Sequence, residues 1–165
     1  MIRKLLAEQI NCFRLQRHDF LNHFQVIMGY LQINKPDRAL QYMRQSLQEI
    51  ENEQKIAQIP EDILGAILLG WVTRLRKEGI RSTISFPDVM KDQNYWLNNW
   101  FEEQAEAFYS YTTECPEVES AGSNQPEQEK YAEIILEEEF TCTFRLLRAG
   151  VLLQEKRISL RKGSA

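Results

Sequence analysis

Residues 10–33, INCFRLQRHDFLNHFQVIMGYLQI, decide the fold of this chain. Apolar side chains recur in this stretch at alternating intervals of three and four residues, and only Arg17 interrupts them: Ile10, Phe13, Phe20, Phe24, Ile27 and Leu31. This spacing is that of the a and d positions in a coiled-coil seam. It predicts one long helix over residues 1–33 with a single apolar stripe.

A short turn and a second amphipathic helix follow this stretch. Asn34-Lys35-Pro36-Asp37 interrupts the first helix, and Pro36 suits the first turn of a new helix. Up to about Ala57, a second stripe has the same spacing: Leu40, Met43, Leu47 and Ile50. The two helices predict an antiparallel hairpin. Because one hairpin cannot enclose its own stripe, we expect two copies to pair into a four-helix bundle, which makes the protein a homodimer.

From Pro60 onward the pattern is that of a small α+β unit. Alternating apolar residues indicate strands, and Gly79 is a usual C-terminal residue of a helix. The expected elements are a helix at 61–77, a strand at 80–86, a helix at 95–111, a loop at 113–129, and strands at 130–137, 140–148 and 151–160 with a turn at 149–150. The fold class is therefore α+β, with a hairpin domain at 1–58 and helices on a mostly antiparallel sheet at 59–165.

Composition and charge exclude several classes of function. The net charge of −4 gives no reason to expect nucleic acid or an anionic membrane as partner. No apolar run approaches the roughly 20 residues that cross a bilayer, and the first residues are too polar for a signal peptide. Cys12, Cys115 and Cys142 match no metal motif and indicate reduced thiols. We therefore expect a soluble, cytoplasmic protein.

Two further groups of residues have simple structural explanations. Glu137-Glu138-Glu139 could suggest a metal site, but neighbouring strand residues point to opposite faces, so a solvated turn is expected. Several aromatic residues could line a ligand pocket, but their helical spacing favours a core between helix and sheet: Trp71, Tyr95, Trp96, Trp100, Phe101 and Phe108.

The residues able to carry chemistry lie on the polar face of the first helix. At about 100° per residue, His18 lies roughly 125° from the centre of the apolar stripe and faces water. Neutral imidazole is a nucleophile at cellular pH if its other nitrogen is held protonated, and Asp19 and Asn22 are the neighbours that could orient it. An exposed histidine can equally be an ordinary surface residue. We expect His23, on the other flank of the stripe, to be a packing or interface residue.

Other residues near His18 suit contact with a partner. Arg14, Gln25 and Gly29 lie on the same face, and Gly29 leaves room for the backbone of another protein. Arg14 and Arg17 could neutralise the charge of a phosphoryl group. Arg17 could equally fix the register of the bundle.

Residues 17–43, RHDFLNHFQVIMGYLQINKPDRALQYM, resemble the helical hairpin of the sporulation initiation phosphotransferase B family and of related sensor kinases. The resemblance rests on the pattern His-Asp-x-x-Asn-x-x-Gln and on Lys-x-Asp-x-Ala-Leu in the turn. Residues 63–80, ILGAILLGWVTRLRKEGI, resemble the next helix and turn of these proteins. The resemblance implies that His18 is phosphorylated, that the hairpins pair, and that the second half is a small sandwich resembling a degenerate histidine-kinase ATPase domain.

The second half departs from the ATP-binding pattern of the related kinases. After Gly79 the glycines are isolated, no Asp-x-Gly-x-Gly occurs, and nothing else suggests a phosphate-binding loop. The kinase pattern Asn-x-x-x-Asn can be placed on Asn99 to Glu103, but the magnesium-binding asparagine would then be Glu103.

The resemblance therefore implies a histidine phosphotransferase with no cofactor of its own. It would take a phosphoryl group from the aspartate of one response-regulator receiver and pass it to a second receiver, with Mg²⁺ supplied by the receiver, in a sporulation-type phosphorelay. Two alternatives stay open: a non-catalytic dimeric scaffold that binds a response regulator, and a fragment of a sensor histidine kinase.

Overall fold

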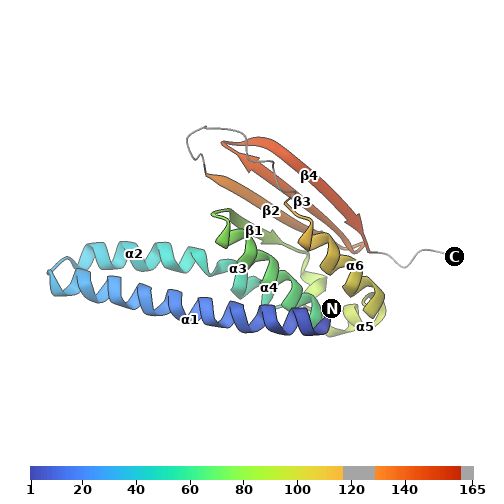
Figure 1. The fold of residues 1–165 in the computed structure, drawn as a ribbon, viewed down its shortest axis with the longest axis horizontal. Helices are drawn as coiled ribbons and strands as arrows, with labels where there is room; N and C mark the ends of the chain where they lie inside the picture. Colours follow the sequence, from blue (N-terminus) through green and yellow to red (C-terminus); the bar gives the residue numbers. More distant parts are fainter. Residues whose placement is uncertain (117–128, 161–165) are drawn as a thin grey trace.

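The computed structural model describes residues 1–116 and 129–160. A long helical hairpin forms one end of the molecule, and a four-stranded sheet covered by helices on one face forms the other (Figure 1). Most of the loop expected at 113–129 lies outside the described residues. The elements are α1 (Ile2–Gln32), α2 (Pro36–Glu49), α3 (Glu51–Ile56), α4 (Asp62–Lys77), β1 (Arg81–Ser85), the 3-10 helix η1 (Asp88–Lys91), α5 (Gln93–Asn99), α6 (Glu102–Thr113), β2 (Lys130–Glu137), β3 (Thr141–Arg148) and β4 (Val151–Ser159).

The antiparallel hairpin of α1 and α2 is confirmed. Asn34 adopts a positive φ of 57° in the turn, a conformation that asparagine tolerates after a helix end, and Pro36 is the first residue of α2. The second predicted helix is interrupted, however, because Ile50 separates α2 from α3. The break lets α3 dock on the edge strand β1, where the Asn52 side chain donates to the Ser82 carbonyl (2.7 Å) and accepts from the Ile84 amide (3.1 Å).

The sheet has the order β1-β2-β3-β4, with β1 parallel to β2 and the other pairs antiparallel, so the mostly antiparallel sheet is confirmed. Its apolar face lies against α4 and α6 and shares one core with them. The opposite face carries cross-strand ion pairs, such as Arg145 with Glu155 (2.6 Å). Ala149 and Gly150 both have positive φ and form the expected turn between β3 and β4.

The aromatic residues form a core, as predicted, with one exception. Trp71, Trp96 and Phe108 are at most 2% exposed, and the Trp71 ring stacks on Phe144 of β3. Phe101 is 39% exposed. It lies at a break that replaces the single helix predicted over 95–111 by α5 and α6.

The break at Trp100 and Phe101 follows from tertiary packing. Trp100 turns back so that its ring meets those of Trp96 and Phe140 edge-on. The Gln104 side chain then accepts a hydrogen bond from the Phe101 amide at the start of α6 (2.8 Å). As a result, Asn99 lies on α5 and Glu103 lies on α6. The kinase pattern would place both residues on one helix.

The three consecutive glutamates occupy the end of β2 and an exposed turn, as expected. Glu137 pairs with Arg157 of β4 (2.7 Å). Within residues 1–116 and 129–160, no three His, Cys, Asp or Glu side chains converge as metal ligands. The three cysteines are buried and free, and burial raises the pKa of the Cys142 thiol above its ordinary value. None of the described helices has the length and apolar character needed to cross a membrane.

The first third of α1 packs on the second half of the chain. Leu5 is 7% exposed and belongs to the shared core, and Gln9 donates to the Ala66 carbonyl of α4 (2.8 Å). Glu8 forms an ion pair with Arg74, and a Cβ atom at Gly70 would lie only 2.7 Å from the Glu8 carboxyl carbon. This docking brings the middle of α1, which carries His18, beside the C-terminal end of α4.

Candidate functional site

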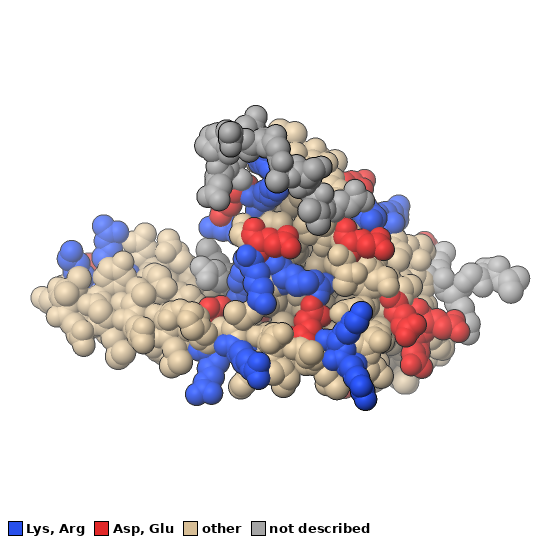
Figure 2. Space-filling model, in the orientation of Figure 1, with Lys and Arg blue, Asp and Glu red and all other residues tan. Residues whose placement is uncertain are grey.

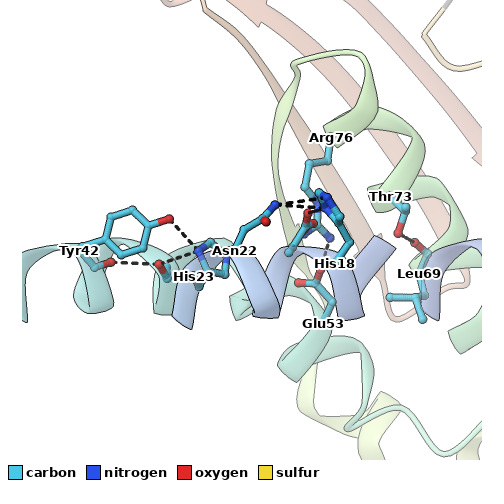
Figure 3. Close-up of polar contacts among 10 residues, drawn as sticks. His18, Asn22, His23, Tyr42, Glu53, Leu69, Thr73 and Arg76 are labelled. Carbon is cyan, nitrogen blue, oxygen red and sulfur yellow. Dashed lines mark hydrogen bonds and ion pairs between the residues drawn. The ribbon is translucent and has the colours of Figure 1, made fainter. Parts of the chain in front are cut away.

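His18 lies in the middle of α1 and faces solvent, with 70% of its side chain exposed. Its Nδ1 atom is 3.4 Å from Oδ1 of Asp19 and 3.2 Å from Nδ2 of Asn22 (Figure 3). These neighbours are one and four residues away, so a single helix turn assembles the group. The structure thus brings together the three residues that the sequence singled out for nucleophilic chemistry.

Two hydrogen bonds compete for Nδ1 of His18. The Asp19 carboxylate can only accept, so its contact requires a proton on Nδ1. The Asn22 amide nitrogen can only donate, so its contact requires a bare Nδ1 lone pair. When Nδ1 carries the proton, Nε2 keeps its lone pair and is the nucleophilic atom of the ring.

Asp19 also contacts the second half of the chain. Its Oδ2 atom is 3.9 Å from a guanidinium nitrogen of Arg76 on α4, and Arg76 forms a second ion pair with Glu53 of α3. Figure 3 shows Arg76 and Glu53 beside His18, so that side chains from three helices meet there. Sequence reasoning missed Arg76 and Glu53 because no local spacing relates residues 19, 53 and 76.

The residues expected to contact a partner are accessible on α1. Arg14 and Gln25 are exposed, and a Cβ atom at Gly29 would have no neighbour within 4 Å. The surface beside Gly29 is therefore open, as expected. Arg17 is also exposed, which suits either of the two roles considered for it. Figure 2 shows Lys and Arg side chains gathered across the middle of the molecule, whereas the tip of the hairpin carries few charges on this face.

His23 links the two helices of the hairpin. Its Nδ1 atom is 2.9 Å from the Tyr42 hydroxyl and 3.3 Å from the Ser46 hydroxyl, both on α2. The side chain is half-buried, and its ring packs at an angle against that of Tyr42. The expectation that His23 is a packing residue is confirmed.

Residues 2–59 match the family model described as Sensor_kinase_SpoOB-type, alpha-helical domain. The helical hairpin is therefore similar to the alpha-helical domain of SpoOB-type sensor kinases. The match spans α1, α2 and α3 and includes His18, Asp19 and Asn22, and it confirms the resemblance of the hairpin, whereas residues 63–80 lie outside it. No curated protein matches the chain. The model's description names sensor kinases as the class of protein in which this helical domain occurs.

The SpoOB-type hairpin leaves its apolar stripe uncovered in the single chain. On α1, most residues of the stripe are about half exposed or more: Ile10, Phe13, Phe20, Phe24 and Leu31. On α2, Leu40 and Leu47 are 46% and 59% exposed. Exposed apolar residues that share one stripe are typical of an interaction site.

Proposed function

We propose that this chain is a histidine phosphotransferase, in which His18 takes a phosphoryl group from one response-regulator receiver and passes it to another. The observation that carries the proposal is an exposed His18 at the centre of a SpoOB-type hairpin, with a carboxylate beside Nδ1. Exposure gives a partner protein access to the ring. The carboxylate favours the tautomer in which Nε2 is free to react.

In the proposed reaction, Nε2 of His18 attacks the phosphorus of an aspartyl phosphate on the donor receiver. The new N–P bond forms as the P–O bond to the receiver carboxylate breaks, and that carboxylate leaves with the bonding electrons. Asp19 stabilises the positive charge that develops on the ring. The aspartate of the second receiver then attacks the phosphohistidine, which restores neutral His18.

Positioning and charge neutralisation are the main contributions that such a transfer requires. We assign Arg14, Gln25 and Gly29 to the receiver interface, because they are accessible on the face that carries His18. The receiver supplies the Mg²⁺ ion that neutralises its own phosphoryl group. We place the reaction in the cytoplasm.

The donor is proposed to be a protein rather than ATP. The related kinases hold magnesium with an asparagine-bearing helix, whereas here the corresponding segment is split between α5 and α6 and carries Glu103. The glycines of the second half are also isolated in sequence. These features support a degenerate ATPase-like domain that does not bind nucleotide.

The working form is proposed to be a homodimer. Pairing two copies of α1 and α2 would bury both apolar stripes in a four-helix bundle. Because His18 lies away from the stripe, pairing would leave it on the outside of the bundle, within reach of a receiver.

Incubation with phosphorylated receivers tests the proposal. We expect the chain to acquire label that is lost in acid and kept in base, as phosphoramidates are. If receivers bind but no label is transferred, the chain is a scaffold. Magnesium-dependent binding of ATP at micromolar concentration, followed by labelling from ATP, would instead identify a sensor-kinase fragment.

A further inference from the structure

We infer that Arg76 of α4 is a positioning residue that fixes the proton on Nδ1 of His18 by holding Asp19 in place. The inference concerns the same site and rests on the function proposed above. It means that the sheet-bearing half of the chain, through α4, contributes to the reactivity of a histidine on the hairpin.

The two oxygens of Asp19 face different partners. Oδ1 lies 3.4 Å from Nδ1 of His18, and Oδ2 lies 3.9 Å from the guanidinium of Arg76. The Asp19 side chain is 41% exposed, so water competes for both oxygens. A cation facing Oδ2 limits rotation of the carboxylate and keeps Oδ1 directed at the ring.

Arg76 is itself held from two sides. Its helix is anchored by Val72 and Leu75, which are 3% and 1% exposed in the core. Its guanidinium pairs with Glu53, whose side chain is only 14% exposed. The α3 helix that carries Glu53 is attached to β1 through Asn52. A group supported in this way can orient a flexible neighbour.

The orientation of the Asp19 carboxylate matters because Asn22 is an alternative hydrogen-bond partner of His18. Nδ2 of Asn22 lies 3.2 Å from Nδ1 and 3.5 Å from Nε2, so it can donate to either nitrogen and is nearer to Nδ1. If Asp19 turned away, the Asn22 contact would favour a bare Nδ1 and a proton on Nε2. That tautomer has no lone pair on the atom proposed to attack phosphorus, so loss of Arg76 would slow transfer without removing the nucleophile.

Nitrogen-15 NMR of the histidine rings tests the inference on the protein alone. The chain has only two histidines, so the spectrum is simple. At a pH where the ring is neutral, wild-type His18 should be mainly protonated on Nδ1. Arg76→Gln should move the proton toward Nε2, and Arg76→Lys should restore part of the original ratio. The His23 signals serve as an internal control and should not change, because that ring contacts Tyr42.

Asp19→Asn provides a second variant in case Arg76→Gln fails to fold. It leaves the Arg76–Glu53 pair in place and replaces the carboxylate by an amide, so it should also reduce the population protonated on Nδ1. The inference is overturned if wild-type His18 is mainly protonated on Nε2, or if Arg76→Gln folds and keeps the wild-type ratio.

Kinetics with a receiver provide the second readout. Arg76→Gln should lower the rate of phosphoryl transfer on the order of tenfold or more, with the Kd for the receiver unchanged. A loss of affinity with an unchanged transfer rate would make Arg76 a receiver contact and contradict a positioning role. If no receiver labels the wild-type protein, the proposed function fails, whereas the ring tautomers still decide the role of Arg76.

Discussion

Replacing Phe24 by aspartate should convert the proposed dimer into a monomer. Phe24 is 62% exposed in the single chain. Given about 200 Å² for a phenylalanine side chain, pairing would remove about 120 Å² of it from water. At about 25 cal/mol per Å², this burial contributes about 3 kcal/mol per copy, or about 6 kcal/mol for a symmetric dimer.

The expected loss of affinity is therefore large. Since about 1.4 kcal/mol corresponds to a tenfold change, losing the Phe24 contact should raise the Kd of the dimer about ten-thousandfold. Desolvation of two carboxylates would add to this effect. The folded monomer should survive, because Phe24 contributes little to the core of the single chain.

Sedimentation velocity over a range of micromolar concentrations measures the effect, with circular dichroism to confirm folding. Leu97→Asp is the matched control, because Leu97 is 67% exposed but lies on α5, outside the apolar stripes of α1 and α2. The control should remain dimeric. A Phe24→Asp protein that dimerises like wild type, or a wild-type chain that is a folded monomer, would refute the reasoning.

Three further predictions concern the site and the fold. Asp19→Ala and Asn22→Ala should each slow transfer on the order of ten- to a thousandfold, because Asp19 holds the ring in its reactive tautomer and Asn22 lies on the face that meets the receiver; unchanged labelling rates would contradict these roles. Ala149→Asn should stabilise the protein by about 1 kcal/mol in urea unfolding, since asparagine suits the positive φ of this turn better than alanine; a loss of stability would argue against that turn. Leu5→Ala should cost about 2–4 kcal/mol, and a change near zero would mean that the start of α1 does not pack on the core.

Elements that depend on local pattern could be predicted from the sequence. The three-four spacing on α1 and the alternation in β3 are properties of neighbouring residues, and both elements occur where expected. The group of His18, Asp19 and Asn22 could also be predicted, because helical geometry fixes residues one and four positions apart. The roles of these residues and the domain boundary at 58 remain predictions.

Features that depend on distant contacts could not be predicted in this way. The helix breaks at Ile50 and at Trp100-Phe101 occur without a proline or glycine at those positions. Both breaks follow from packing against residues far along the chain. The contact of Asp19 with Arg76 has the same origin, since it exists only because α1 docks on α4. Tertiary structure therefore adds to the site a cation that helical periodicity could not reveal.

The most direct test of the central claim compares the two histidines. His18→Gln and His23→Gln are incubated with the same phosphorylated receiver, and acid-labile label on each chain is measured after folding and dimer formation have been verified. His18→Gln should acquire no label, whereas His23→Gln should keep most of the wild-type labelling, because His23 bonds to Tyr42 within the hairpin. Full labelling of His18→Gln together with loss of labelling in His23→Gln would contradict the account.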